Sequence, residues 1–328
     1  MLIDLRSDTV TRPTPGMLKF MFNAKVGDDV FKEDPTIIEL EKKAAVLFGK
    51  ESGLYCPSGT MTNQTAIKVH TQPGDEVICD VTAHVYNYEG GGMAFNSAVQ
   101  AKLLSGDNGR FTAKQLEQVL HPYADWLAPT SLVTIENTSN RGGGTYYQLK
   151  NVKEISQVCK KNKLSLHLDG ARIFNALTET GDSPKEYGKI CDSISICLSK
   201  GLGAPLGSVL LGSAEFIAKA RRVRKLLGGG MRQGGYLAAA GIYALDHNIK
   251  RLKEDHQRAK YLAKILAKKS YVVNMLPTET NIIIFSLDSS MPAEKFMNTL
   301  KKDNILVSLI GNNALRIVTH LDFLKMQS

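Results

Sequence analysis

The chain has 328 residues, 43% of them hydrophobic and 22% charged, which is typical of a globular protein of two domains with a sizeable core. Its net charge of +9 is scattered along predicted helices, and no recognition motif accompanies the densest basic cluster, residues 221–225, so we predict no nucleic-acid partner. Neither a signal peptide nor an apolar run of membrane-spanning length occurs, and five cysteines without a Cys-x-x-Cys pair disfavour disulfides and zinc, which together predict a cytoplasmic protein.

Helices and strands alternate through the first two-thirds of the chain. Asp34 and Pro35 begin an apolar-periodic stretch that ends at Gly49, a pattern typical of a capped helix with a glycine stop. Asn151, followed by Glu154, predicts the capped start of another helix. Further helices are expected over 57–70 and 112–120, and strands over 74–80, 131–137, 164–170, 193–200 and 207–212. This alternation indicates βαβ units and a mainly parallel sheet, in which ligands bind at the carboxyl ends of the strands.

The pattern changes after about residue 245. A basic helical stretch over 247–269 precedes a strand over 281–287, a helix over 293–302, and two short strands near 305–308 and 314–318. We therefore predict an α/β protein with a large domain over 1–245, whose N-terminal segment contributes to the active site, and a smaller α+β domain over 246–328.

Lys200 and Asp169 are the residues that point most directly to chemistry. Lys200 follows the predicted strand 193–200 and precedes a glycine-rich turn that lets the backbone pass closely beneath a flat ring. A lysine amine forms an imine with an aldehyde cofactor, and a carboxylate such as Asp169 at the end of a neighbouring strand can keep a pyridinium nitrogen protonated. The pair therefore predicts pyridoxal 5′-phosphate (PLP), held on Lys200. Arg172 could reach the ring oxygen or a substrate carboxylate.

An alternative interpretation of Asp169 is a metal ligand together with His167, because residues i and i+2 of a strand point to one face. No third ligand is placed nearby by the sequence, so we predict no metal site. We expect His167 instead to be a packed strand histidine beneath the cofactor.

A phosphate site is predicted at the start of the helix 57–70. Ser58 and Gly59 resemble a turn that opens a helix, and the backbone N–H groups of Gly59 and Thr60, with the Thr60 hydroxyl, would face a phosphate there. The alternative is an ordinary serine–glycine cap. Arg232 stands at another predicted helix start and is a second phosphate candidate, or else a flexible loop arginine. His84 could stack on a ring face and relay a proton, although a lone histidine is usually structural.

Eight segments in this order resemble the low-specificity L-threonine aldolases, which are fold-type I PLP enzymes of the aspartate aminotransferase class within the β-eliminating lyase and threonine aldolase group. The segments are DLRSDTVT (4–11), GDDVFKEDPT (27–36), PSGTM (57–61), SLVTIENT (131–138), HLDGARIFNA (167–176), SKGLGAPLGS (199–208), LGGGMRQ (227–233) and LRIVTH (315–320). The resemblance implies retro-aldol cleavage of L-threonine or L-allo-threonine to glycine and acetaldehyde. It also implies a homotetramer built from dimers whose active sites use both subunits.

Matched residue by residue, the resemblance implies that Lys200 carries the cofactor, His84 stacks on the ring, and Asp169 pairs with its nitrogen. It implies that Arg232 reaches the phosphate of the neighbouring subunit. The substrate carboxylate is expected to be held by Ser7, Arg172 and Arg316.

Two residues depart from the family pattern. Ser139 and Trp126 stand where members place histidines, and this puts recognition of the β-hydroxyl group in question. The residues themselves leave two other functions open. One is a PLP enzyme that breaks another bond of a small amino acid, such as a β-eliminating lyase or a racemase, and the other is a PLP-fold binding protein without turnover.

Overall fold

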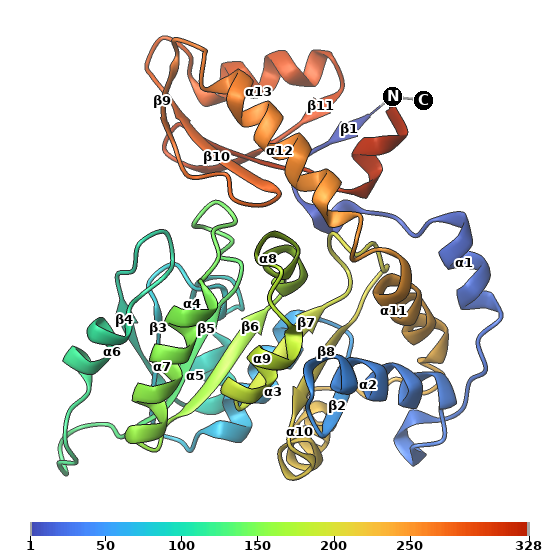
Figure 1. Ribbon diagram of the computed structural model, residues 1–328, viewed down its shortest axis with the longest axis vertical. Coiled ribbons are helices and arrows are strands. Elements are labelled where there is room, and N and C mark those ends of the chain that lie inside the picture. The colour runs from blue at the N-terminus through green and yellow to red at the C-terminus, as the bar shows by residue number, and fades with distance from the viewer. Residues whose placement is uncertain (1, 327–328) are drawn as a thin grey trace.

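The computed structural model describes residues 2–326, and they form two bodies, one above the other in Figure 1. The lower body is built around a large mixed sheet with helices on both faces. The upper body contains a small antiparallel sheet, helices α12 (Leu252–Leu266) and α13 (Ala293–Lys302), and the N-terminal strand β1 (Ile3–Asp4). The α/β class and the smaller α+β part near the C-terminus are therefore confirmed.

The large sheet has the strand order β2-β8-β7-β6-β5-β3-β4. Neighbouring strands from β7 to β4 run parallel, whereas β8 is antiparallel to both β2 and β7, so β2 points the same way as the parallel strands. The strands are β2 (Ser52–Cys56), β3 (Glu76–Asp80), β4 (Gln100–Leu104), β5 (Thr130–Glu136), β6 (Ser165–Gly170), β7 (Ser193–Cys197) and β8 (Ser208–Gly212). Six of these strands therefore end at one common edge, which we call the carboxyl edge.

Helices cover both faces of this sheet, as expected for strands that are buried on two sides. One face carries α3 (Gly59–His70), α5 (Gly92–Ser97) and α10 (Ala214–Leu226). The other face carries α2 (Pro35–Phe48), α7 (Leu149–Lys161) and α9 (Pro184–Ile190), with α6 (Ala113–Val119), α11 (Gly235–His247) and α1 (Pro15–Phe22) packed farther out. The short helices α4 (His84–Asn87) and α8 (Ile173–Thr180) follow β3 and β6 at the carboxyl edge. Single turns of 3-10 helix occur at Asp8–Val10 and Asp29–Phe31.

The upper body has its own apolar core, to which Phe285, Leu315 and Ile317 contribute. Its sheet has the antiparallel order β12-β13-β10-β9, formed by β9 (Val272–Met275), β10 (Ile282–Leu287), β12 (Ser308–Gly311) and β13 (Ala314–Val318), and a 3-10 helix follows at Leu321–Met326. Strand β1 pairs in parallel with β11 (Ile305–Leu306), so the first residues of the chain lie beside its last strands. The segment Ser7–Thr11, which follows β1, passes between the two bodies before the chain enters the large one (Figure 1). The domain boundary at 245/246 stays a prediction.

Local signals explain where several helices begin and end. The Asp34 side chain accepts hydrogen bonds from Thr36 and Ile37, Pro35 is the first residue of α2, and Gly49 ends it in the left-handed conformation. The predicted cap at Asn151 was wrong, because α7 begins at Leu149, after Gln148, which makes no side-chain cap bond. Side-chain capping was therefore not what set the start of this amphipathic helix, whose buried face, including Val152 and Ile155, packs on the sheet.

No helix among residues 2–326 is long and apolar enough to cross a membrane. All five cysteines are free thiols in buried positions.

Candidate active site

The carboxyl edge of the large sheet gathers the predicted functional residues. Ser58 follows β2, His84 follows β3, and Lys200 follows β7. Asp169 is the penultimate residue of β6 and pairs in register with Glu136, the last residue of β5. These residues are remote in sequence but meet because parallel strands end at the same edge.

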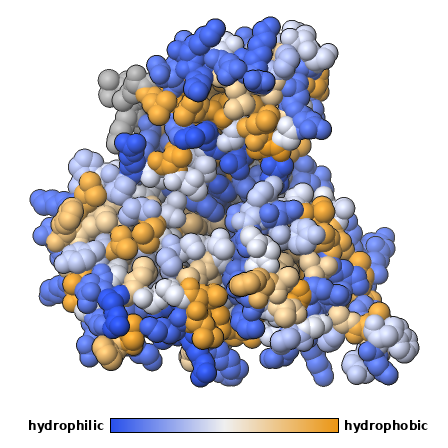
Figure 2. Space-filling model, turned by 180° about the vertical axis from the view of Figure 1, so that it is seen from behind, coloured by the Kyte–Doolittle hydropathy of each residue, from blue (hydrophilic) through white to orange (hydrophobic). Residues whose placement is uncertain are grey.

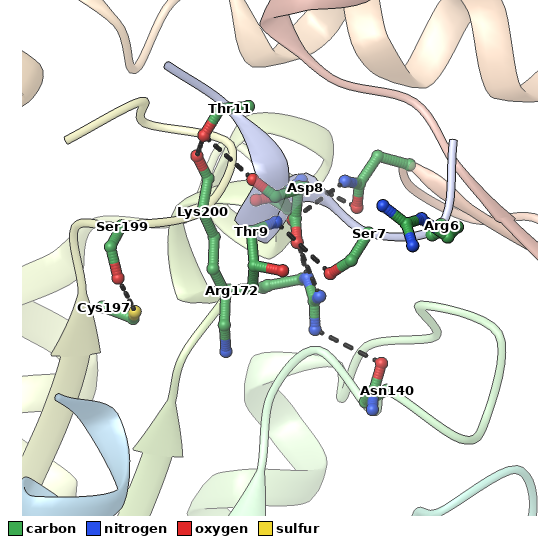
Figure 3. Close-up of polar contacts among 12 residues, drawn as sticks. Arg6, Ser7, Asp8, Thr9, Thr11, Asn140, Arg172, Cys197, Ser199 and Lys200 are labelled. Atoms are coloured by element: carbon green, nitrogen blue, oxygen red, sulfur yellow. Dashed lines mark hydrogen bonds and ion pairs between the residues drawn. The ribbon is translucent and has the colours of Figure 1, made fainter. Parts of the chain in front are cut away.

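Lys200 lies in a tight loop that joins β7 to β8. Its carbonyl oxygen accepts hydrogen bonds from the Thr11 hydroxyl at 2.9 Å and from the backbone N–H of Gly203 at 2.8 Å. The side chain is half-buried and extends beside Arg172, away from its own anchored backbone (Figure 3). The anchored backbone therefore fixes the point from which the Lys200 side chain and its amine extend.

Asp169 is buried and held by donors on both oxygens. One oxygen accepts from the backbone N–H of Ala171 at 3.1 Å, and the other accepts from the Asn63 amide at 2.9 Å. These two donors fix the orientation of the Asp169 carboxylate at the carboxyl edge. A buried carboxylate of this kind is suited to pair with a protonated ring nitrogen.

His84 lies at the start of α4, with Nδ1 3.0 Å from a carboxylate oxygen of buried Glu89. Burial alone would lower the pKa of His84, but the hydrogen bond to Glu89 and the negative charge of Asp169 outweigh burial and raise this pKa. One oxygen each of Asp169 and Glu89 lies within 4.8 Å of a His84 ring nitrogen. The donors Asn63 and Gln64 also bind these carboxylates, so hydrogen bonds account for the closeness of the three groups.

Glu136 is a second buried carboxylate behind His84. Its oxygens accept from the backbone N–H groups of His84 and Asn140, both at 2.8 Å. Burial, together with the nearby charge of Asp169, raises the pKa of Glu136 to about 7 against the effect of its hydrogen bonds. Glu136 thereby ties α4 to the loop that follows β5.

Arg172 is buried and forms two hydrogen bonds with Asp8, Nε–Oδ2 at 2.8 Å and Nη2–Oδ1 at 2.7 Å. Burial alone would raise the pKa of Asp8, but the charge and hydrogen bonds of Arg172 outweigh it and hold this pKa far below its usual range. Figure 3 shows this pair beside the Lys200 side chain. Asp8 was not among the predicted site residues, although it is the next residue after Ser7.

Arg316, on β13, extends to the Asn140 side chain that Arg172 also approaches. Its Nη1 donates to the Asn140 side-chain oxygen at 2.8 Å, and Arg172 Nη1 lies 3.4 Å from that oxygen. Burial, together with the charge of Arg172, lowers the pKa of Arg316 to about 10. The Nε atom of Arg316 is buried and has no hydrogen-bond partner in the described part of the chain. Because Asp8 neutralises Arg172, the positive charge of Arg316 remains available to an anion.

Ser7 lies beside this cluster, since it precedes Asp8, and its hydroxyl caps the following turn by accepting from the Thr9 N–H at 3.3 Å. Arg316 also donates to the carbonyl oxygen of Arg6, the residue before Ser7. The structure thus brings together all three residues that we predicted to bind the substrate carboxylate.

The predicted phosphate site lies at the N-terminus of α3. Ser58 is the N-cap and accepts from the Met61 N–H, while helix geometry leaves the N–H groups of Gly59 and Thr60 without an acceptor inside the helix. The buried hydroxyl of Ser208 next to Gly59 has no partner among the described residues. Free N–H groups and an unpaired hydroxyl suit a phosphate. A lysine amine, a buried carboxylate and this anion site on one edge fit PLP.

Arg232 lies apart from these groups in the chain. Its side chain is 60% exposed and pairs with Asp28 at 2.7 Å, and its backbone carbonyl accepts from Asp29. Among the described residues of one chain, Arg232 therefore makes no hydrogen bond or ion pair with the start of α3. A role in another subunit stays a prediction.

The two departures from the family pattern are resolved differently. Trp126 precedes β5, so it lies toward the opposite edge of the sheet, and it is 83% exposed. Trp126 therefore does not lie among the carboxyl-edge residues of its own chain, and the sequence had left its role open. Ser139 lies just past the carboxyl end of β5, but it is buried and its hydroxyl accepts from the Gly142 N–H at 3.1 Å.

The metal alternative for His167 does not fit its surroundings. His167 and Asp169 do face the same side of β6, as predicted, and Asn63 contacts both. However, both ring nitrogens of His167 are engaged, Nδ1 with Ser193 at 2.8 Å and Nε2 with Asn63 at 3.1 Å. Burial lowers the pKa of His167 to about 3, so the ring is a neutral part of the core.

Comparisons with known proteins agree with this site. The model of the beta-eliminating lyase family matches residues 4–290. Low-specificity L-threonine aldolase 1 of Arabidopsis thaliana is 41% identical over 97% of this chain and 91% of its own length, and the low specificity L-threonine aldolase of Escherichia coli (strain K12) is 40% identical over 99% and 96%.

Solved structures show the same fold. A putative L-allo-threonine aldolase from Listeria monocytogenes has a TM-score of 0.83 and 21% identity, and it covers 99% of this chain and 92% of its own. Threonine aldolase of Leishmania major has a TM-score of 0.82 and 19% identity, with 97% and 94% covered. From the family match and the two relatives of about 40% identity, we conclude that this chain belongs to the low-specificity L-threonine aldolase family of PLP-dependent beta-eliminating lyases.

Proposed function

We propose that the chain is a PLP-dependent lyase that cleaves L-threonine and L-allo-threonine to glycine and acetaldehyde. The observation that carries the proposal is the position of Lys200 beside a buried, charge-neutral Arg172–Asp8 pair and close to a second arginine, Arg316. An amino acid needs its carboxylate held near the group that binds its amine, and this arrangement supplies both. The names of the relatives support threonine as the substrate.

When bound, PLP supplies an electron sink that stabilises negative charge at the substrate Cα. We propose that Lys200 holds its aldehyde carbon, Asp169 its ring nitrogen, and Ser58, Gly59 and Thr60 its phosphate. His84 is proposed to cover one ring face. These assignments rest on the positions of the side chains at the carboxyl edge.

His84 is also the proposed proton acceptor for the β-hydroxyl group. With Nδ1 directed at the Glu89 carboxylate, a neutral His84 carries its proton on Nδ1 and leaves Nε2 free to accept. Glu89 then stabilises the charge that develops on the ring, which is how a buried carboxylate assists a histidine base. Arg172 is proposed to help hold the ring oxygen or the substrate carboxylate, next to Arg316 and Ser7.

Arg316→Ala is expected to weaken substrate binding more than cofactor binding. A guanidinium grips a carboxylate through two hydrogen bonds, and losing a charged hydrogen bond costs roughly 1.5–3 kcal/mol, or about 10- to 150-fold in kcat/KM. Arg316→Lys keeps the charge but not the paired geometry and should recover only part of this loss. Steady-state kinetics with L-threonine, with PLP affinity measured separately, checks the prediction, and an unchanged kcat/KM in Arg316→Ala would contradict it.

Both threonine diastereomers are expected to be cleaved, with a modest preference. They differ only in which β-substituent is hydroxyl and which is methyl, and the Ser139 hydroxyl is already engaged by Gly142. With Ser139 engaged elsewhere, His84 has no second polar partner to fix the side on which the hydroxyl lies, so we expect discrimination of about 10- to 200-fold rather than the several powers of ten of a site built to recognise that side. Catalytic efficiencies on L-threonine and L-allo-threonine test the proposed function, and a preference above about 10³-fold would exclude low specificity.

We further propose a homotetramer in the cytoplasm. Free, buried cysteines support a reducing compartment. Apolar residues reach the surface in several places in the rear view (Figure 2), and large exposed examples elsewhere on the chain include Phe22, Phe31, Phe95 and Leu226. Exposed apolar surface of this kind supports contacts between subunits.

In such an assembly, Arg232 is proposed to reach the phosphate held by the neighbouring subunit. Mixing Arg232→Ala chains with Lys200→Ala chains should then recover activity, because a mixed dimer contains one site with both residues intact. Neither variant alone should be active to the same degree. Activity of the mixture that never exceeds the average of the separate variants would contradict action across subunits.

A further inference from the structure

A layer of polar side chains lies between helix α3 and the large sheet, where an apolar core would be expected. Strand β6 directs His167 and Asp169 toward α3, and strand β7 directs Ser193 and Ser195 the same way, while the strand residues between them, Leu168 and Ile194, are apolar. On α3 the buried polar residues Thr62 and Asn63 meet them, Thr62 at Ser195 and Asn63 at His167 and Asp169. Burying so many polar groups is costly unless each finds a partner, so the arrangement calls for a specific role.

Within this layer, one hydrogen-bonded chain runs from His70 to the active site. His70 Nε2 lies 2.8 Å from the Ser193 hydroxyl, which lies 2.8 Å from Nδ1 of His167. His167 Nε2 lies 3.1 Å from the Asn63 side-chain oxygen. The Asn63 amide nitrogen then donates to Asp169 and to Glu89, both at 2.9 Å.

Chemistry assigns a single direction to every bond of this chain. Asn63 faces two carboxylates that can only accept, so its nitrogen points to them and its oxygen to His167. His167 must therefore carry its proton on Nε2, and its Nδ1 accepts from the Ser193 hydroxyl. Ser193 is then free to accept from His70 Nε2. Burial lowers the pKa of both His70, to about 4, and His167, to about 3, which agrees with neutral rings.

His70 stands at the far end of the sheet from the cofactor site. It is the last residue of α3, whose first turn forms the proposed phosphate site, and a helix of this length spans about 18 Å. Its ring stacks on Phe216 with centroids 4.5 Å apart and borders a cleft of about 360 Å³ at the opposite edge. The chain thus links an outer residue to the carboxylates around the ring site.

We propose that His70, Ser193 and His167 are positioning residues that act through Asn63 on Asp169. By fixing the Asn63 amide, they keep both of its N–H groups on Asp169 and Glu89, which holds these carboxylates in place for the ring nitrogen and for His84. The proposal rests on the proposed function for the pairing of Asp169 with PLP. It extends the site by residues that touch neither the substrate nor the cofactor.

Three variants test the chain from its outer end. Ser193→Ala removes the central hydroxyl, and His70→Phe keeps a ring on Phe216 but removes the N–H donor. Each is expected to weaken PLP binding by about 3- to 10-fold, the equivalent of one neutral hydrogen bond, and to lower kcat with little change in KM for L-threonine. His70→Gln retains an N–H donor and should restore most of the PLP affinity.

Ser156→Ala is the matched control, because the Ser156 hydroxyl is also buried and donates to a backbone carbonyl, that of Ile190, outside this chain. It should leave PLP affinity unchanged. The measurement is PLP titration of the cofactor-depleted full-length chain, with denaturant unfolding to compare stabilities. Nitrogen-15 NMR of labelled histidine should show His167 protonated on Nε2 in the wild-type holoenzyme.

The proposal is overturned if Ser193→Ala and His70→Phe bind PLP as tightly as the wild type, if Ser156→Ala weakens binding equally, or if His167 carries its proton on Nδ1. If the proposed function itself is wrong, the same experiments give other results. A chain that binds PLP but does not cleave threonine leaves the affinity test intact, whereas a chain that binds no PLP removes both proposals.

Discussion

Lys200→Ala is expected to lower turnover of L-threonine by at least about 10³-fold, because no other group can replace an amine that both carries the aldehyde cofactor and exchanges it with the substrate. The loop that presents Lys200 is held through its backbone by Thr11 and Gly203, so truncating the side chain should leave the fold intact. Steady-state assays together with unfolding measurements separate loss of chemistry from loss of structure.

Lys50→Ala is a suitable control for this experiment. Lys50 is another half-buried lysine, but it lies before β2 at the opposite edge, where its amine donates to the carbonyl oxygen of Cys191. It should retain turnover. In the wild type, borohydride reduction should attach the cofactor to the peptide that contains Lys200, and attachment to a different lysine would contradict the assignment.

Asp8→Asn is expected to destabilise the folded chain by about 3–5 kcal/mol, because it leaves the buried Arg172 guanidinium without a counter-charge. The change should also reduce activity, since Arg172 lies beside Lys200. Asp4→Asn is the matched control: Asp4 pairs with Arg6 at 2.6 Å, but the Arg6 side chain is 52% exposed, so the pair is worth only about 0–1 kcal/mol. Denaturant unfolding at neutral pH measures both effects, and equal losses in the two variants would contradict the prediction.

The same carboxylate predicts a pH dependence of stability. The pKa of Asp8 is lower in the folded state than in an unfolded chain, where it is about 3.9. Its contribution to the free energy of unfolding is therefore fully present above that value and is lost as the pH falls below it. The difference in stability between the wild type and Asp8→Asn should shrink below about pH 4. A difference that grows on acidification would show that the sign is wrong.

The sequence predicted the parts of the site that strand ends determine. Lys200 lies just beyond β7 and Asp169 just before the end of β6, where apolar runs give way to polar residues, and the helix over Pro35–Phe48 follows from an aspartate cap and a glycine stop. The sheet direction follows from the alternation of elements. These features depend on residues close together in sequence, so they can be predicted before the fold is known.

The sequence did not reveal the residues that support these groups. Asn63, Glu89 and Glu136 lie far from Asp169 in sequence, and a buried polar residue in a helix has no local pattern that distinguishes it from an exposed one. The place of Trp126 could not be predicted, because its loop precedes β5 and the spacing of a loop does not indicate the edge of the sheet on which it lies. The polar alternation of 193–197 was visible, but only the packing of α3 shows what the serines contact.

Several PLP enzymes could share this arrangement, because the groups that hold the cofactor do not themselves select the bond that breaks. A β-eliminating lyase would convert threonine to 2-oxobutyrate and ammonia, and a racemase would return its mirror image at Cα. A binding protein without turnover would leave the amino acid unchanged.

Product analysis after incubation of the PLP-loaded chain with L-threonine therefore tests the central claim most directly. We expect glycine and acetaldehyde in equal amounts, with neither product formed by Lys200→Ala. Formation of 2-oxobutyrate and ammonia, of D-amino acid, or of no product at all would contradict the proposed retro-aldol cleavage.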